Sequence, residues 1–145
     1  MANKRANNLP SHEAIEAELQ WRAQHKLESF YPETGPLRRE LYVKHMQFFD
    51  AGVEKDERLF MAANRVGKTE GVGAYECALH LTGKYPAWWE GRRFTRPTVG
   101  WAAGQTSKTT RDIIQLALLG PGPRYGTGMI PADVLIKHNS QSWHS

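Results

Sequence analysis

Residues 62–69 are the segment that most constrains what this chain can fold into. The segment consists of Ala62, Ala63, Asn64, Arg65, Val66, Gly67, Lys68 and Thr69. It follows the apolar run 59–61 and precedes a helix-compatible stretch that extends to about Gly83. A strand that enters a tight turn and continues as a helix is typical of a phosphate-binding loop, because the first N–H groups of that helix can bind phosphate oxygens. Residues 62–69 are therefore predicted to bind a nucleotide triphosphate.

Two side chains of this loop have predicted roles. Lys68 is expected to contact the β and γ phosphates, and Thr69 is expected to place its hydroxyl on a Mg²⁺ ion that bridges the same oxygens. The usual motif is G-x-x-x-x-G-K-[ST], and this copy has Ala62, the smallest substitute, where the first glycine belongs. The expected cofactors are ATP and Mg²⁺. The alternative is a G-K-T tripeptide that occurs in a loop by chance.

The periodicity of the chain predicts four helices and three strands. The helices are expected at 11–28, 37–51, 68–81 and 107–119, and the strands at 59–62, 97–103 and 133–137. The connection between the first two strands is long enough for a helical crossover, which favours a parallel pair. The predicted fold is therefore α/β, with an incomplete parallel sheet of the P-loop NTPase type, flanking helices and preceding N-terminal helices. Residues 1–52 are interpreted as a helical lead-in, and residues 53–145 as the first part of a P-loop domain.

Composition narrows the location and the partners of the protein. With 145 residues, 40% hydrophobic and 23% charged, the chain can form one domain with a core. No apolar run has membrane-spanning length, and the single cysteine, Cys77, rules out an internal disulfide, so a cytoplasmic protein is expected. We expect Cys77 to be a small buried apolar residue. Residues 92–145 carry seven Lys or Arg against two Asp or Glu, a bias that permits contact with nucleic acid but is equally typical of a solvated basic face.

Two further features are open to alternative interpretations. Gln47 lies in an aromatic-rich helix before the loop, where many ATP-driven DNA and RNA motors have a glutamine that reads the adenine edge; it is a candidate adenine-reading residue, or an exposed glutamine without a role. The stretch 82–94 contains Trp88 and Trp89 beside two arginines. These rings could stack on nucleobases, or they could anchor a long loop to the domain surface.

An acidic element for ATP hydrolysis is missing from the sequence. Such an element is usually an apolar strand that ends in Asp, often followed by Glu, and it holds the magnesium and activates water. The apolar residues 134–136 are instead followed by Lys137 and His138, while Asp112 and Asp133 precede apolar residues. The six histidines and the cysteine have no metal-ligand spacing. We therefore expect the chain to bind ATP without an obvious means of hydrolysing it.

These segments together resemble the large terminase subunit of tailed bacteriophages. The resemblance is carried by the helix that contains Gln47, residues 58–63, the loop 64–70, the tryptophan-rich stretch 82–94 and the segment 99–101. It extends from about residue 35 to the end of the sequence. In that family an N-terminal ATPase domain drives double-stranded DNA through a portal into an empty procapsid, and a C-terminal nuclease domain with an RNase H-like fold cuts the DNA concatemer.

The resemblance implies roles for individual residues. It implies residues 62–67 as the phosphate cradle, Lys68 and Thr69 as phosphate and magnesium contacts, and Gln47 as the adenine reader. Lys68 and Arg65 would be the catalytic residues, with Arg65 as the sensor of the γ phosphate, although it lies one place nearer the lysine than is common. The acidic ATPase motif, the coupling motif and the nuclease carboxylates of the family have no counterpart here, so the chain is expected to be the N-terminal piece of a terminase.

The resemblance also implies partners and a location. The expected partners are double-stranded DNA, the portal protein, the small terminase subunit and further copies of the chain on the portal, without a membrane. The expected location is the host cytoplasm, at the procapsid during assembly. Two alternatives stay open: a helicase-like DNA-dependent ATPase, which would share the loop and the glutamine, and a non-catalytic assembly protein derived from a terminase.

Overall fold

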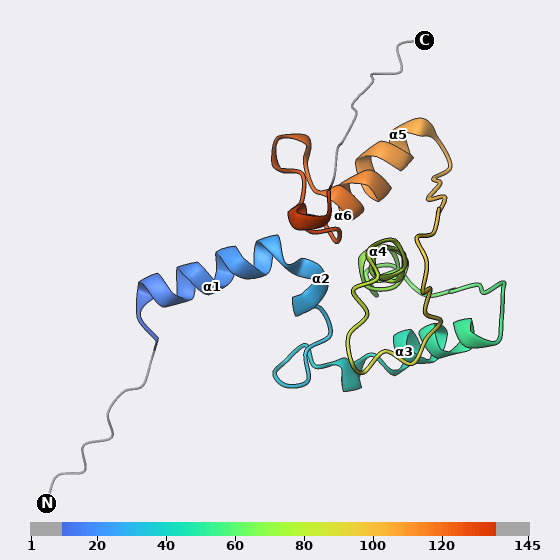
Figure 1. The fold of residues 1–145 in the computed structure, drawn as a ribbon, viewed down its shortest axis with the longest axis horizontal. Coiled ribbons are helices and arrows are strands. Elements are labelled where there is room, and N and C mark those ends of the chain that lie inside the picture. The colour runs from blue at the N-terminus through green and yellow to red at the C-terminus, as the bar shows by residue number, and fades with distance from the viewer. Residues whose placement is uncertain (1–9, 136–145) are drawn as a thin grey trace, which may run out of the picture.

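Residues 10–135 are described by the computed structural model, and their regular structure is helical (Figure 1). The helices are α1 (His12–Gln24), α2 (Lys26–Ser29), α3 (Val43–Asp50), η3 (Lys68–Ala74) continued by α4 (Tyr75–Thr82), and α5 (Ser107–Thr109) continued by η4 (Thr110–Gln115) and α6 (Leu116–Leu119). Short 3-10 turns are η1 (Arg39–Leu41), η2 (Ala51–Val53), η5 (Gly122–Arg124) and η6 (Ala132–Val134). All four expected helices are therefore present, although α3 begins later than the sequence predicts.

Local signals in the sequence set the ends of these helices. The Ser11 hydroxyl accepts a hydrogen bond from the N–H of Ala14 at 3.2 Å and so caps the start of α1. The Thr106 and Thr109 side chains form a reciprocal capping box at the start of α5. Gly83 ends α4 in the left-handed conformation, with φ of 70°, and its N–H donates to the Leu79 carbonyl at 2.9 Å. These ends lie where the sequence predicts them.

The predicted parallel sheet is wrong. Among residues 10–135 the β pairing consists of one isolated antiparallel bridge between Thr127 and Pro131. The expected strands at 59–62 and 97–103 have no regular structure and no strand partner among the described residues. Phe60 packs partly against the core, but four other apolar side chains are largely exposed: the exposed fractions are 80% for Leu59, 83% for Met61, 90% for Val99 and 94% for Trp101. The third expected strand contains the turn η6, and its last two residues lie outside the described residues.

The reason for this difference is that the helix 68–82 packs on aromatic rings instead of a sheet. A parallel strand is stable only when neighbouring strands take up its N–H and C=O groups and helices cover both faces. Here Tyr75 and Leu79 of α4 are at most 1% exposed and lie in a core with Tyr31, Phe49 and Trp89. The apolar segments 59–62 and 97–103 therefore do not pair into a ladder.

Residues from both predicted parts of the chain contribute to this core. Leu27, Tyr31 and Phe49 come from the part before residue 53, and α4 comes from the part after it. The division at residue 52 stays a prediction. None of the helices between residues 10 and 135 combines the length and the apolar character needed to cross a bilayer.

Candidate functional site

The predicted phosphate loop lies directly before the helix 68–82, as the sequence predicts. Arg65 and Gly67 have left-handed backbone conformations, with φ of 64° and 79°, so the chain turns sharply into the helix. The Gly67 carbonyl accepts from the N–H groups of Gly71 at 2.7 Å and Val72 at 3.1 Å. Within the described part of the chain, no acceptor is found for the backbone N–H groups of residues 68–70. These three donors are therefore available at the positive end of a helix.

The Lys68 ammonium closes the loop on itself. Its Nζ atom donates to the carbonyl oxygens of Ala62 and Ala63, at 2.6 Å each. The lysine is thus held at the loop and does not extend into water. Free backbone donors and a lysine ammonium on one short loop are the donor set that binds phosphate oxygens, so these residues fit a polyphosphate.

Other loop residues line two separate cavities. Arg65, Val66 and Gly67 line a cavity of about 1020 Å³ that also borders α1, α2 and the start of α3. Thr69 lines a separate cavity of about 500 Å³, which is otherwise formed mainly by residues 101–105 and the helical run 107–119. Asn64 is exposed. Residues 10–135 contain no cluster of three or more His, Cys, Asp or Glu residues suited to a metal ion, so the predicted magnesium contact rests on the Thr69 hydroxyl.

Gln47 is not joined to the loop by a hydrogen bond. Its side chain is exposed and accepts from the Lys44 ammonium at 3.1 Å. On the same helix His45 faces the loop, and two residues further along an α-helix correspond to a rotation of about 200°. Gln47 therefore lies on the other side of α3, and its role as an adenine reader stays a prediction.

His45 and Tyr31 lie directly behind the loop, and the sequence did not single them out as site residues. His45 Nε2 lies 3.0 Å from the Val66 carbonyl oxygen, and His45 Nδ1 lies 2.5 Å from the Tyr31 hydroxyl, which donates to the Gly71 carbonyl at 2.6 Å. His45 and Tyr31 are 6% and 3% exposed. The available signal was a histidine on the apolar face of α3, four residues before the buried Phe49.

The close packing of His45 and Tyr31 behind the loop explains why positions 67 and 71 are glycines. A Cβ atom at Gly67 would lie 3.3 Å from His45 Cε1, and one at Gly71 would lie 2.9 Å from the Tyr31 hydroxyl and 3.3 Å from His45 Cε1. Gly71 thus allows close approach of the helix to Tyr31 and His45.

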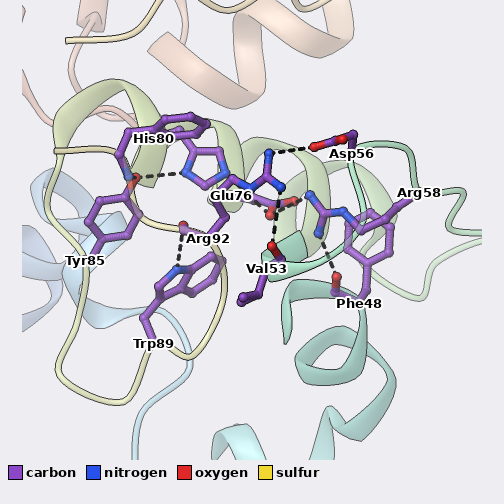
Figure 2. A network of polar contacts seen from close by, with 10 residues as sticks. Phe48, Val53, Asp56, Arg58, Glu76, His80, Tyr85, Trp89 and Arg92 are labelled. Carbon is purple, nitrogen blue, oxygen red and sulfur yellow. Dashed lines mark hydrogen bonds and ion pairs between the residues drawn. The ribbon is translucent and has the colours of Figure 1, made fainter. Parts of the chain in front are cut away.

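The tryptophan-rich stretch is an anchor and not an exposed stacking platform. Trp89 is 2% exposed, and its ring centroid lies 4.8 Å from that of Phe49. Its Nε1 donates to the Arg92 carbonyl at 3.1 Å (Figure 2). The Arg39 guanidinium lies 5.3 Å from the ring centroid of the half-buried Trp88. Of the two alternatives for this stretch, the structure therefore supports the anchored loop.

Arg92 in this stretch and Arg58 before the loop also anchor neighbouring segments. Arg92 pairs with Asp56 at 3.0 Å, and Arg58 donates to the Phe48 carbonyl at 2.7 Å and to Glu76 at 2.9 Å (Figure 2). His80, one turn along α4, lies 3.5 Å from Glu76 and 3.0 Å from the Tyr85 hydroxyl. Together these contacts fasten the end of α3 and the stretch 84–94 to α4.

Cys77 is less buried than predicted. The side chain is half-buried, and burial is the largest cause that raises the pKa of its thiol. A raised pKa leaves little thiolate near neutral pH, so the residue lacks the character of a nucleophile.

Comparison with known proteins supports a relationship to one protein. No family model and no solved structure matches the chain. The chain is 36% identical, over 139 residues, to the protein named terminase, large subunit, of Salmonella phage P22. The match covers 86% of this chain and 26% of that relative.

The class defined by these observations is a helical segment in which a tight loop, with a lysine ammonium and free backbone N–H groups, leads directly into a helix. Within that class, the similarity identifies the chain as a partial homologue of the terminase large subunit, which confirms the resemblance found in the sequence. The chain spans about a quarter of the length of the relative.

Proposed function

We propose that this chain is the ATP-binding portion of a phage DNA-packaging motor, in which ATP hydrolysis drives double-stranded DNA into procapsids. The observation that carries the proposal is the loop before the helix 68–82, with free N–H groups at residues 68–70 and the Lys68 ammonium held at its carbonyls. The similarity to a phage terminase large subunit supports the same proposal. ATP would supply the energy of the reaction when bound.

Each loop residue has a proposed task. Residues 62–67 cradle the phosphates, Lys68 exchanges its two carbonyl contacts for phosphate oxygens, and Thr69 offers its hydroxyl to Mg²⁺. Arg65, which lines the larger cavity, senses the γ phosphate. Gln47 is proposed as the adenine reader, although it lies on the far side of α3.

The proposed setting is the host cytoplasm at the procapsid. The partners are the portal protein, the small terminase subunit, double-stranded DNA and further copies of the chain on the portal. The surplus of basic residues in 92–145 supports contact with DNA.

Titration of the 145-residue chain with Mg-ATP tests the nucleotide part of the proposal. We expect saturable binding, and a loss of affinity of about tenfold or more for Lys68→Ala, because charge-assisted hydrogen bonds to phosphate contribute about 1.5–3 kcal/mol. Lys55→Ala, which removes an exposed lysine outside the loop, is the matched control and should leave the affinity unchanged. Equal affinities for all three proteins would refute the assignment of the loop.

Two further measurements complete the test. Thr69→Val should weaken the dependence of binding on Mg²⁺ while it keeps the volume of the side chain. The isolated chain should not turn ATP over, since its sequence lacks a recognisable carboxylate that activates water. Rapid release of phosphate would contradict this expectation.

A second candidate function, a non-catalytic assembly protein, is favoured by one observation. Large exposed apolar side chains are typical of surfaces that bind another protein. Residues 10–135 include four that are at least 80% exposed: Leu59, Met61, Val99 and Trp101. Absence of Mg-ATP binding, together with co-elution of the chain with portal protein in size-exclusion chromatography, would favour this candidate over the motor.

A further inference from the structure

The hydrogen bonds behind the phosphate loop require a defined number of protons. A carbonyl oxygen can only accept a hydrogen bond. His45 Nε2 must therefore carry a proton to donate to the Val66 carbonyl. The Tyr31 hydroxyl must likewise point its proton at the Gly71 carbonyl. The third contact, between His45 Nδ1 and the Tyr31 oxygen at 2.5 Å, then needs a proton on Nδ1. Three contacts need three protons, whereas Tyr31 and a neutral imidazole supply two.

Only the imidazolium form of His45 completes this network. If Nε2 alone is protonated, either the Tyr31 oxygen meets a bare Nδ1 or the Gly71 carbonyl loses its donor. If Nδ1 alone is protonated, a bare Nε2 faces the Val66 carbonyl at 3.0 Å. A buried polar contact without its proton is destabilising. Within this geometry, the neutral ring therefore always leaves one contact unsatisfied.

The backbone at this network is held in an uncommon conformation. Among residues 10–135, the non-glycine residues with a left-handed φ are Tyr31, at 53°, and Arg65, at 64°. Tyr31 is in the network, and Arg65 immediately precedes Val66. Each such residue costs on the order of 1 kcal/mol or more and persists only where its surroundings hold it. The network therefore connects two strained positions through the ring of His45.

The charges around His45 do not supply a carboxylate for an imidazolium. The cavity that His45 lines is also lined by the tyrosines Tyr31 and Tyr42 and by the charged residues Glu18, Arg22, Glu28, Lys44, Arg65 and Glu70. Each of the three carboxylates already has a cation: Arg22 at 2.7 Å from Glu18, Lys84 at 3.1 Å from Glu28, and Lys26 at 2.9 Å from Glu70. Burial lowers the pKa of His45, and the contact with Val66 opposes that shift only in part. The ring thus lacks a negative partner within the described residues.

We propose that His45 positions the phosphate loop, and that a bound polyphosphate draws a proton from solvent onto the His45 ring, which completes all three hydrogen bonds. This inference rests on the proposed binding of ATP by the loop. The phosphates bring the negative charge that the surroundings of His45 lack, and the ring touches the loop through the Val66 carbonyl and lies against Gly67. Binding and protonation then favour each other.

The test is calorimetric titration of the full chain with Mg-ATP in two buffers of different ionisation enthalpy, from about pH 8 to about pH 6. We expect wild type to take up a proton on binding, so its affinity rises as pH falls, by up to about tenfold per pH unit. His45→Gln keeps an N–H donor for the Val66 carbonyl but does not titrate, so its proton uptake should fall to that of the nucleotide alone. His12→Gln, which removes an exposed histidine of α1, is the matched control and should behave as wild type.

Two more variants separate positioning from packing. Tyr31→Phe removes the acceptor of Nδ1 and should reduce proton uptake while it keeps the ring. His45→Ala should weaken binding at every pH, and His45→Gln should restore part of this loss at about pH 8. In folded wild type, the pKa of His45 followed by NMR should rise when Mg-ATP is added, so the test does not depend on a variant that folds.

The outcomes distinguish this inference from the proposed function. Equal proton uptake by wild type and His45→Gln, or an unchanged pKa of His45 on binding, would overturn the inference and leave ATP binding intact. Absence of binding at every pH, or binding that is insensitive to Lys68→Ala, would overturn the proposed function itself.

Discussion

Two kinds of non-helical segment differ sharply in this molecule. The stretch 84–94 has neither helix nor ladder, yet Trp89 is 2% exposed and packs on Phe49 of α3, and the Tyr85 hydroxyl lies within hydrogen-bond distance of His80 of α4. The segments 59–62 and 97–103 have apolar residues typical of strands, yet Leu59 is 80% and Trp101 94% exposed. The difference teaches that side-chain contacts can hold a segment in place without regular secondary structure. A strand-like apolar segment is not held in place when no partner strand pairs with it.

The largest expected difference between the two regions comes from their tryptophans. Trp89→Ala should lower the free energy of unfolding by about 3–5 kcal/mol, because it removes a large buried ring and leaves a cavity beside Phe49. Trp101→Ala, the matched change in the exposed segment, should alter it by less than about 0.5 kcal/mol. Urea denaturation followed by circular dichroism measures both, and similar losses would contradict the comparison.

The ion pair that holds Arg58 to α4 gives the next effect. Glu76→Ala should cost about 2 kcal/mol, below the range for a fully buried pair, since the side chains of Arg58 and Glu76 are 18% and 10% exposed. It leaves the Arg58 guanidinium without its carboxylate. Glu57→Ala, at an exposed neighbouring site, is the control for the loss of one negative charge. An equal, small change in both variants would mean that the pair does not anchor this region.

A glycine in each region offers a smaller contrast. A Cβ atom at Gly91 would lie 2.6 Å from Trp89 Cζ2 and 2.9 Å from the Phe49 carbonyl oxygen, so Gly91→Ala should destabilise by about 1–2 kcal/mol. At Gly100 the nearest atom is 3.8 Å away, and Gly100→Ala should be neutral or slightly stabilising through the unfolded chain. Thermal unfolding of the two variants provides the readout, with loss of stability for Gly100→Ala as the contrary result.

The smallest expected effect on stability is that of a substitution at Val99. Val99→Thr exchanges a methyl group for a hydroxyl on a side chain that is 90% exposed, so its free energy of unfolding should change by less than about 0.5 kcal/mol. A loss above 1 kcal/mol in chemical denaturation would mean that the side chain is buried in solution.

The helices and their ends were predictable from the sequence because their signals are local. Ser11, Gly83 and Gly120 mark helix ends through capping and backbone conformation, which depend on a few neighbouring residues. The turn before Lys68 was predicted for the same reason, while its binding of phosphate stays a prediction. The terminase resemblance was confirmed.

The sheet was predicted wrongly because strand formation depends on distant partners. Residues 59–62 and 97–103 have suitable side chains, but nothing within a short segment reveals whether its N–H and C=O groups will find a ladder. The roles of His45 and Tyr31 were missed for a related reason, since 14 residues separate these two and 21 separate His45 from Val66. A histidine on an apolar helix face gives no local indication of which carbonyl it contacts.

The self-contact of Lys68 has a consequence for any anion that approaches. The ammonium is already engaged by two carbonyl oxygens, at 2.6 Å each, so an incoming anion must first compete with the backbone for it. A monatomic anion such as chloride, which cannot span the ammonium and the amides together, should therefore leave the lysine where it is. A ligand that also accepts hydrogen bonds from the neighbouring backbone amides would replace the free energy of the two lost Lys68–carbonyl bonds. The loop would then select ligands by this replacement of hydrogen bonds and not by charge alone.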